Sequence, residues 1–178
     1  TGEARQAHED RLRRTDFAQP ALGAIEWGMS KILGRFGIRP DAVCGHSYGE
    51  LVALSVAGVL DESTLMGLSR LRGRLMAGDG EDRGAMLAVK ASPADLAPLI
   101  TESRLDVVLA NLNSPSQCVL SGSHEAIDRA AEACKALGFA STKLQVSGAF
   151  HSPLMADAAE SMRSAIEASA FAGPQFPV

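Results

Sequence analysis

A serine flanked by two glycines constrains the fold of this chain more than any other feature. Gly45, Ser47 and Gly49 follow a short apolar run at 41–44 and precede a long apolar segment at 51–60. In a G-x-S-x-G turn the serine occupies a tight strand-to-helix bend, where side chains in place of the glycines would clash with the adjoining backbone. Such a bend exposes the hydroxyl and directs helix N-terminal N–H groups toward negative charge beside it. The pattern predicts a short strand at 41–44 that leads into a nucleophile elbow, although a surface serine in a glycine-rich turn would give the same letters.

The composition is that of an ordinary globular protein. Of 178 residues, 46% are apolar and 21% charged, so one domain, or one with a small subdomain, is expected. The net charge of -4 gives no reason to expect nucleic acid, and we interpret the cluster of Arg11, Arg13 and Arg14 as a solvated helix face. No apolar run reaches the roughly 18 residues of a membrane span, and no signal peptide is visible, which favours a cytoplasmic protein. The chain starts at Thr1 without a methionine and ends in an apolar tail at 176–178, so we expect a piece of a longer protein.

Three cysteines, Cys44, Cys118 and Cys134, are spread along the chain. Their odd number and wide spacing fit neither a disulfide framework nor a zinc site. We therefore expect buried free thiols and no metal.

Three helical segments are expected around the elbow. From Pro20 apolar residues recur at intervals of three and four and line one helical face, and the helix ends at Gly37. The residues on this face are Leu22, Ile25, Met29, Ile32, Leu33 and Phe36. The segment 51–60 is apolar almost all round, which predicts a central buried helix behind the elbow. Asp61 is a candidate N-cap for a third helix that runs to about Ala77.

The third helix carries one arginine on its apolar face. At about 100° per residue, Arg72 falls among Leu65 and Leu68, whereas Arg70 and Arg74 lie on the opposite side and face water. A guanidinium on an apolar face needs an anion, because burying it unpaired is costly. The anion is either an internal carboxylate, in a buried salt bridge, or the carboxylate of a substrate held by a bidentate clamp.

From residue 84 to residue 146 the sequence is divided into short segments, some with strand character and some with helix character. We predict strands at 85–89, 106–110, 117–120 and 140–146, with helices at 93–102 and 123–137. The resulting order, β-α-β-β-α-β, is that of a ferredoxin-like fold. It indicates a small subdomain inserted into a larger α/β unit.

A histidine follows this subdomain, at the junction of a loop and a last helix that runs to about residue 168. His151 is a candidate base for Ser47, because a serine nucleophile needs one. Alone it would be read as a capping or packing histidine. The rivals are His46, whose side chain should point away from the hydroxyl, His124 at a helix start in the subdomain, and His8 in the polar segment 1–19.

Several motifs together resemble the malonyl-CoA:acyl-carrier-protein acyltransferases, including the acyltransferase domains of polyketide synthases. The resemblance extends from about residue 18 to residue 178. It rests on A-Q-P-A-L at 18–22, G-H-S-Y-G-E at 45–50, R-G-R-L-M at 72–76, N-S-P at 113–115 with V-L-S-G at 119–122, and G-A-F-H-S at 148–152.

This resemblance implies a role for each candidate residue. Ser47 would attack the malonyl-CoA thioester with His151 as general base, Arg72 would hold the malonyl carboxylate, and the Tyr48 backbone N–H would form part of the oxyanion hole. Phe150 would favour malonyl over methylmalonyl, because its ring would crowd an α-methyl group. The acyl group would pass to the phosphopantetheine thiol of an acyl carrier protein in polyketide biosynthesis, with no cofactor of the chain's own. Neighbouring ketosynthase or other synthase domains would be further partners.

The resemblance also implies the architecture. The fold class would be α/β, with a hydrolase-like core at 1–83 and 147–178, incomplete at both ends, that has a parallel sheet and the nucleophile elbow. The segment 84–146 would be the inserted ferredoxin-like subdomain. The family's G-Q-G motif, which completes the oxyanion hole, is expected upstream of Thr1.

Two other functions fit the elbow. One is an α/β-hydrolase-type thioesterase or carboxylesterase, which would use the same serine with an acid and a histidine but would leave Arg72 without a purpose. The other is a non-catalytic docking domain of a synthase, which the presence of Ser47, Arg72 and His151 argues against.

Overall fold

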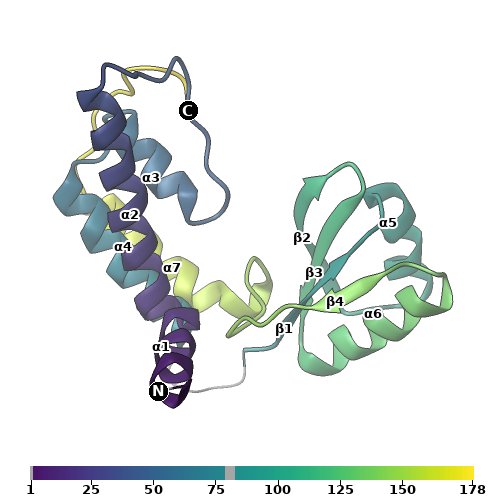
Figure 1. Cartoon of the computed structure of the whole chain (residues 1–178). Helices are drawn as coiled ribbons and strands as arrows, with labels where there is room; N and C mark the ends of the chain where they lie inside the picture. The colour runs from purple at the N-terminus through teal and green to yellow at the C-terminus, as the bar shows by residue number, and fades with distance from the viewer. Residues whose placement is uncertain (1, 79–82) are drawn as a thin grey trace. The chain divides into compact units, whose positions relative to one another are not determined.

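The chain divides into two compact units, residues 1–75 with 158–178 and residues 76–157. The structure is a computed structural model that describes residues 2–78 and 83–178 (Figure 1). The second unit includes the whole of the segment 84–146 that the sequence predicts as a subdomain.

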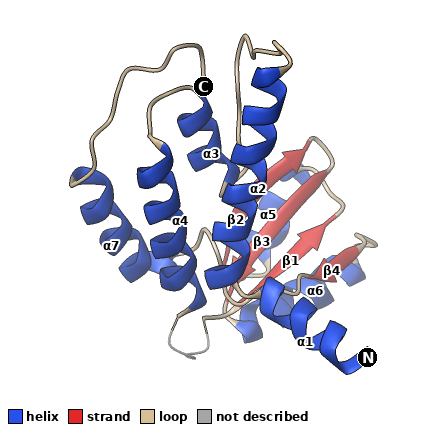
Figure 2. Ribbon diagram, turned by 60° about the vertical axis from the view of Figure 1, so that its left-hand side comes forward, coloured by secondary structure: helices blue, strands red, loops and turns tan. Residues whose placement is uncertain are grey.

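Helices and loops make up the first unit, and no strand is formed within residues 2–75 and 158–178 (Figure 2). The helices that lie wholly or partly in it are α1 (Gly2–Arg13), α2 (Thr15–Arg35), α3 (Gly49–Val56), α4 (Glu62–Ala77) and α7 (Ala156–Glu167). The strand predicted at 41–44 is instead an irregular extended segment, in which the Val43 N–H donates to the Pro177 carbonyl at 3.0 Å. The prediction of a strand there is wrong for the described residues, because this one bond is not a ladder.

Helix bounds in this unit differ from the prediction where turn residues intervene. Helix α2 begins at Thr15, so Pro20 lies inside it instead of at its start. Helix α3 ends at Val56 instead of reaching residue 60, because Gly58 has a φ of 82°, a left-handed conformation that ends a helix. Helix α4 begins as predicted, since Asp61 Oδ1 accepts the Thr64 N–H at 2.7 Å.

The apolar face predicted for α2 is present but exposed. Its large side chains are between 44% and 80% accessible, and they are Leu22, Ile25, Met29, Ile32, Leu33 and Phe36. The buried cluster of this unit is small and consists of Tyr48, Val52 and Leu65. The described residues therefore leave one side of α2 without a packing partner. Segment 51–60 is likewise not buried all round, since Leu51 and Val56 are half-buried.

The second unit contains one four-stranded sheet with the strand order β2-β3-β1-β4. Along the chain its elements are β1 (Ala85–Val89), α5 (Pro93–Glu102), β2 (Val107–Ser114), β3 (Gln117–Gly122), α6 (His124–Ala136), β4 (Ser141–Lys143) and the short 3-10 helix η1 (Pro153–Met155). This is the β-α-β-β-α-β order read from the sequence. Helices α5 and α6 lie on the same side of the sheet (Figure 2).

Strand register explains how this sheet builds a core. In the β1–β3 pair Leu87 faces Leu120 and Val89 faces Cys118, so alternate residues of both strands point to one side. These side chains are buried with Ile127 of α6 and with residues of α5 in a continuous cluster.

All strand pairs in the described residues are antiparallel. The chain is therefore a mixed α/β protein, but the parallel sheet predicted for its core is not found within residues 2–78 and 83–178.

The cysteines are unpaired in the described structure. Cys118 and Cys134 are buried as predicted, and burial raises the pKa of both thiols. Cys44 is exposed, so the prediction that it is buried is wrong, because the extended segment that carries it joins no sheet among the described residues. Within the described ranges, no helix combines the length and the apolar character needed to cross a membrane.

Candidate active site

The elbow around Ser47 is a strained turn at the start of α3. Ser47 has a φ of 53°, a left-handed conformation that costs an L-residue roughly 1–2 kcal/mol. A Cβ on Gly45 would lie 2.1 Å from the Gly49 carbonyl carbon, so glycine is required there. Gly49 itself has open space around the position of a Cβ among the described residues, so the predicted clash is wrong for that glycine.

The turn leaves one backbone donor beside the serine. The N–H groups of Gly49 and Glu50 donate to the carbonyls of His46 and Ser47, at 3.0 and 3.3 Å. The Tyr48 N–H, in contrast, donates to no acceptor in the part of the chain that the structure describes. It precedes the first residue of α3, so it combines an unused donor with the positive end of a helix dipole.

Helix α4 presents the arginine that the helical angles single out. Leu65 and Leu68 are buried and Arg72 is half-buried, whereas Arg70 and Arg74 are exposed. The predicted division of the three arginines is thus confirmed.

The Arg72 guanidinium lies against the serine. Its Nη2 donates to Ser47 Oγ at 3.2 Å. Burial lowers the pKa of Arg72, and the nearby Glu50 carboxylate partly opposes this shift. No carboxylate within the described residues lies within ion-pair distance of Arg72, so the alternative of a buried salt bridge finds no partner there. A half-buried cation beside a hydroxyl can receive an anionic group of a ligand bound at that hydroxyl.

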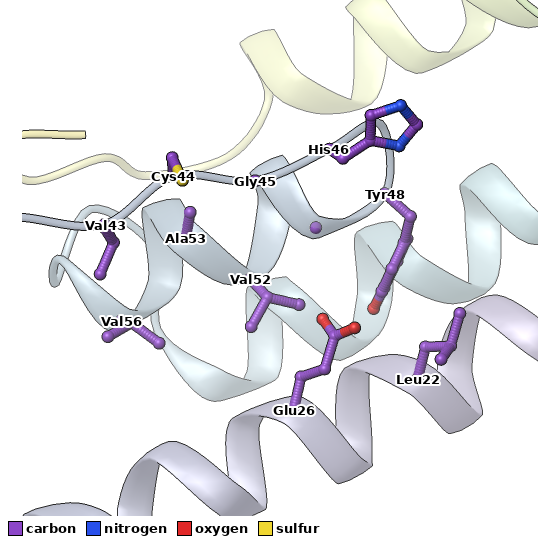
Figure 3. A pocket seen from close by; sticks show the side chains of 11 residues that line it. Leu22, Glu26, Val43, Cys44, Gly45, His46, Tyr48, Val52, Ala53 and Val56 are labelled. Atoms are coloured by element: carbon purple, nitrogen blue, oxygen red, sulfur yellow. The ribbon is translucent and has the colours of Figure 1, made fainter. Parts of the chain in front are cut away.

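A cavity of about 390 Å³ lies beneath the elbow, between it, α2 and α3 (Figure 3). The Glu26 carboxylate and the Tyr48 ring project into it from opposite sides (Figure 3). Its lining is Leu22, Glu26, Val43, Cys44, Gly45, His46, Tyr48, Gly49, Val52, Ala53 and Val56. The His46 imidazole is exposed and points away from this cavity (Figure 3).

The Tyr48 side chain is held by a residue that the sequence analysis missed. The Tyr48 hydroxyl and Ser69 Oγ are 2.6 Å apart, and Ser69 in turn donates to the Leu65 carbonyl at 2.6 Å. Burial raises the pKa of Tyr48. The available signal was the position of Ser69 on the same helical face as Leu65 and Arg72, at a spacing of four and three residues.

The second unit holds His151 and Phe150, in the turn that precedes η1. Ser152 Oγ donates to the Ala149 carbonyl at 2.6 Å, and the Ala149 N–H donates to the Arg83 carbonyl at 2.7 Å. Phe150 is half-buried in this turn. His151 is exposed and has a φ of 60°. The structure thus brings Ser47, Tyr48 and Arg72 together in one unit and places His151 and Phe150 in the other.

The remaining candidate bases, His8 and His124, are exposed side chains on helices. His8 is exposed on α1, and His124 is exposed at the first position of α6. Among the described residues, no three side chains of histidine, cysteine, aspartate or glutamate are grouped as metal ligands would be.

Together these features define a mixed α/β protein whose serine lies on a strained turn at a helix N-terminus beside a half-buried arginine. This chain belongs to the acyl transferase domain family, whose model matches residues 4–178.

Relatives of this chain include very long synthases. It is 44% identical over 147 residues to mycoketide-CoA synthase of Mycobacterium tuberculosis, which is 83% of this chain and 3% of that protein. It is 36% identical over 173 residues to polyketide synthase GfsA of Streptomyces halstedii, or 97% of this chain and 2% of that protein.

Solved structures of acyltransferases are also similar to this chain. The acyltransferase domain from the second module of the salinomycin polyketide synthase is 37% identical, with a TM-score of 0.87 over 94% of this chain and 39% of that chain. The malonyl CoA-acyl carrier protein transacylase from Coxiella burnetii is 34% identical, with a TM-score of 0.89 over 95% of this chain and 55% of that chain. The chain therefore spans 39% and 55% of the length of these two solved chains, and only 3% and 2% of the two synthases.

Proposed function

We propose that this chain is part of the acyltransferase domain of a polyketide synthase and moves a malonyl group from coenzyme A to an acyl carrier protein through an ester on Ser47. The observation that carries the proposal is the 3.2 Å contact of Arg72 Nη2 with Ser47 Oγ on a strained elbow. A carboxylate bound at Arg72 would lie within reach of that hydroxyl, and malonyl has a carboxylate one methylene away from its thioester carbonyl.

In the proposed reaction His151 is the general base, on the strength of the G-A-F-H-S motif around it. It takes the Ser47 proton as Oγ attacks the thioester carbonyl, and it protonates the departing coenzyme A thiolate when the C–S bond breaks. The pantetheine thiol of the carrier protein then gives its proton to His151 and attacks the ester, after which Ser47 regains a proton. No cofactor of the chain's own is needed in these steps.

The developing oxyanion needs hydrogen-bond donors, and we assign one to the Tyr48 backbone N–H. Its lack of an acceptor in the described structure and its position before α3 support this role. Loss of one such donor typically lowers the rate by about 10²–10³-fold. Phe150 is our candidate for the residue that favours malonyl over methylmalonyl, because an aromatic ring beside His151 would crowd an α-methyl group.

The proposal extends to the fold and the partners. The antiparallel sheet and the β-α-β-β-α-β order support a ferredoxin-like subdomain at 84–146. We propose that the remaining segments, 1–83 and 147–178, belong to a hydrolase-like core whose parallel strands come from other parts of the domain and cover the apolar face of α2. Besides the carrier protein, the partners would be a neighbouring ketosynthase or other synthase domains, in the cytoplasm.

The decisive experiment is incubation of the full acyltransferase domain that contains this chain with malonyl-CoA, followed by peptide mass spectrometry. We expect the mass of one malonyl group on the Ser47 peptide and its transfer to added carrier protein. Ser47→Ala removes the hydroxyl and should abolish labelling. Labelling that survives this substitution would refute the proposal, and release of free malonate with no transfer to carrier protein would favour a thioesterase.

The proposal that other strands of the domain pack on the apolar face of α2 can be tested separately. In the full domain Ile32→Ala should lower the free energy of unfolding by about 2–5 kcal/mol, as for a buried isoleucine. A change below about 0.5 kcal/mol, typical of a surface site, would mean that this face stays exposed there too.

A further inference from the structure

The side chain of Tyr48 has a fixed hydrogen-bond direction. Ser69 has a single hydroxyl proton, and it donates that proton to the Leu65 carbonyl, which can only accept. The 2.6 Å contact between the Tyr48 and Ser69 hydroxyls therefore has Tyr48 as its donor. Both side chains are buried, Ser69 completely and Tyr48 to 6% exposure, so this chain of two bonds is shielded from water.

Helix α2 has a glycine, Gly23, next to the Tyr48 hydroxyl. A Cβ added to Gly23 would lie 2.1 Å from the Tyr48 hydroxyl oxygen and 3.3 Å from Ser69 Oγ. These distances mean that a side chain at position 23 would displace the tyrosine. Gly23 is thus the place on α2 where the end of the Tyr48 ring fits.

Two consecutive elbow residues are in this way bonded to two residues one turn apart on α4. Ser47 accepts from Arg72, and Tyr48 donates to Ser69. Residues three apart on a helix lie on one face, so α4 contacts the elbow at two adjacent points.

We infer that Ser69 and Gly23 are positioning residues for the acyl-transfer site, which act through the Tyr48 ring to hold the Tyr48 N–H and the Ser47 hydroxyl in register with Arg72. This inference rests on the proposed function, because it assigns the fixed geometry to the loading of Ser47. The reacting groups tolerate little displacement, since an error of about 1 Å can lower a rate by about 10²-fold.

The first test compares Ser69→Ala, Tyr48→Phe and the double variant in the full acyltransferase domain. Ser69→Ala leaves a buried hydroxyl donor without its partner, so the rate of Ser47 loading at saturating malonyl-CoA should fall about tenfold with little change in KM. Tyr48→Phe removes that donor, so the double variant should load faster than Ser69→Ala alone. Ser55→Ala is the matched control, because Ser55 is also buried and bonded to a carbonyl, that of Leu60 at 3.1 Å.

The second test uses the space at Gly23. Gly23→Ala should slow loading, and adding Tyr48→Phe should restore much of it, because the phenylalanine lacks the oxygen that the new Cβ would strike. Gly23→Ala, with and without Tyr48→Phe, still tests the inference if the Ser69→Ala variant fails to fold. The inference is overturned if Ser69→Ala and Gly23→Ala load at the wild-type rate, if Ser55→Ala slows loading equally, or if Tyr48→Phe rescues neither variant.

A fluorophosphonate probe separates the inference from the proposed function. The probe reacts with an activated serine and needs no malonyl group. A wild-type domain that reacts with the probe but not with malonyl-CoA would refute the proposed function. The order of probe reaction rates among the variants would then still support or overturn the positioning role.

Discussion

In the second unit, strands β1 and β3 and helices α5 and α6 share one continuous buried cluster, whereas the buried cluster of the first unit is limited to Tyr48, Val52 and Leu65. The first unit also exposes the apolar face of α2. Yet the first unit carries Ser47 and Arg72. Ser47 and Arg72 therefore lie in the unit with the smaller core, where a few specific contacts hold them, whereas His151, the proposed base, belongs to the unit with the larger core.

The largest expected difference between the units is in thiol reactivity. Cys44 in the first unit is exposed, so iodoacetamide should alkylate it quickly in the folded 178-residue chain. Cys118 and Cys134 are fully buried with raised pKa values, so their reaction needs opening of the second unit and should be slower by at least about 10³-fold. Mass spectrometry after timed quenching measures each site, and Cys44→Ser is the control. Equally slow reaction at Cys44 would contradict the open surface of the first unit.

Removal of a core side chain should affect the two units unequally. Leu120 is fully buried in the second unit, so Leu120→Ala should lower the free energy of unfolding there by about 2–5 kcal/mol. Ile32 is 56% exposed, so Ile32→Ala in the same 178-residue chain should change the stability of the first unit by less than about 0.5 kcal/mol. Hydrogen exchange resolves the units separately. Comparable losses at both positions would remove the distinction between them.

The contact between Arg72 and Ser47 predicts that loss of the arginine slows loading of malonyl more than loading of acetyl. Arg72→Ala should lower the rate of malonyl loading onto Ser47 in the full domain by about 10- to 100-fold, because hydrogen bonds to a charged group are lost. Loading from acetyl-CoA, which has no carboxylate to bind, should change little. Arg74→Ala is the matched control, since Arg74 is exposed on the same helix. Equal loss for both acyl groups would refute the clamp role.

The smallest expected effect is a pH dependence at the start of α4. The Thr64 N–H bonded to Asp61 holds the pKa of that carboxyl below its ordinary value of 3.8. A lowered folded-state pKa stabilises the protein fully above the ordinary value, and this contribution is lost as the pH falls through the lowered one. Asp61→Asn keeps a capping oxygen without the charge. On acidification from about pH 6 to about pH 3, the Tm of the wild type should therefore fall slightly more than that of the variant. Parallel curves would show that the cap does not titrate with folding.

The second unit could largely be predicted from the sequence. The ranges 85–89 and 93–102 match β1 and α5, because a short apolar run and the capping of a helix are local properties. The sorting of Arg72 from Arg70 and Arg74 succeeded for the same reason, since angle around a helix depends on sequence spacing alone.

The features that escaped prediction depend on contacts between distant segments. The periodicity of α2 indicates an apolar face but not what covers it, and in the described structure Ile25 and Ile32 are exposed. The Ser69–Tyr48 bond joins residues 21 positions apart, and no local pattern pairs them. The irregular geometry of 41–44 has the same origin, because a strand requires neighbours that sequence alone does not supply.

The left-handed backbone of Ser47 has a consequence for laboratory evolution of this chain. Glycine adopts a φ of 53° without the steric cost that serine or alanine bears there, so Ser47→Gly is expected to stabilise the turn. A screen that rewards stability or expression alone would then favour loss of the hydroxyl. Selection for a more robust variant therefore has to include a readout of the serine itself.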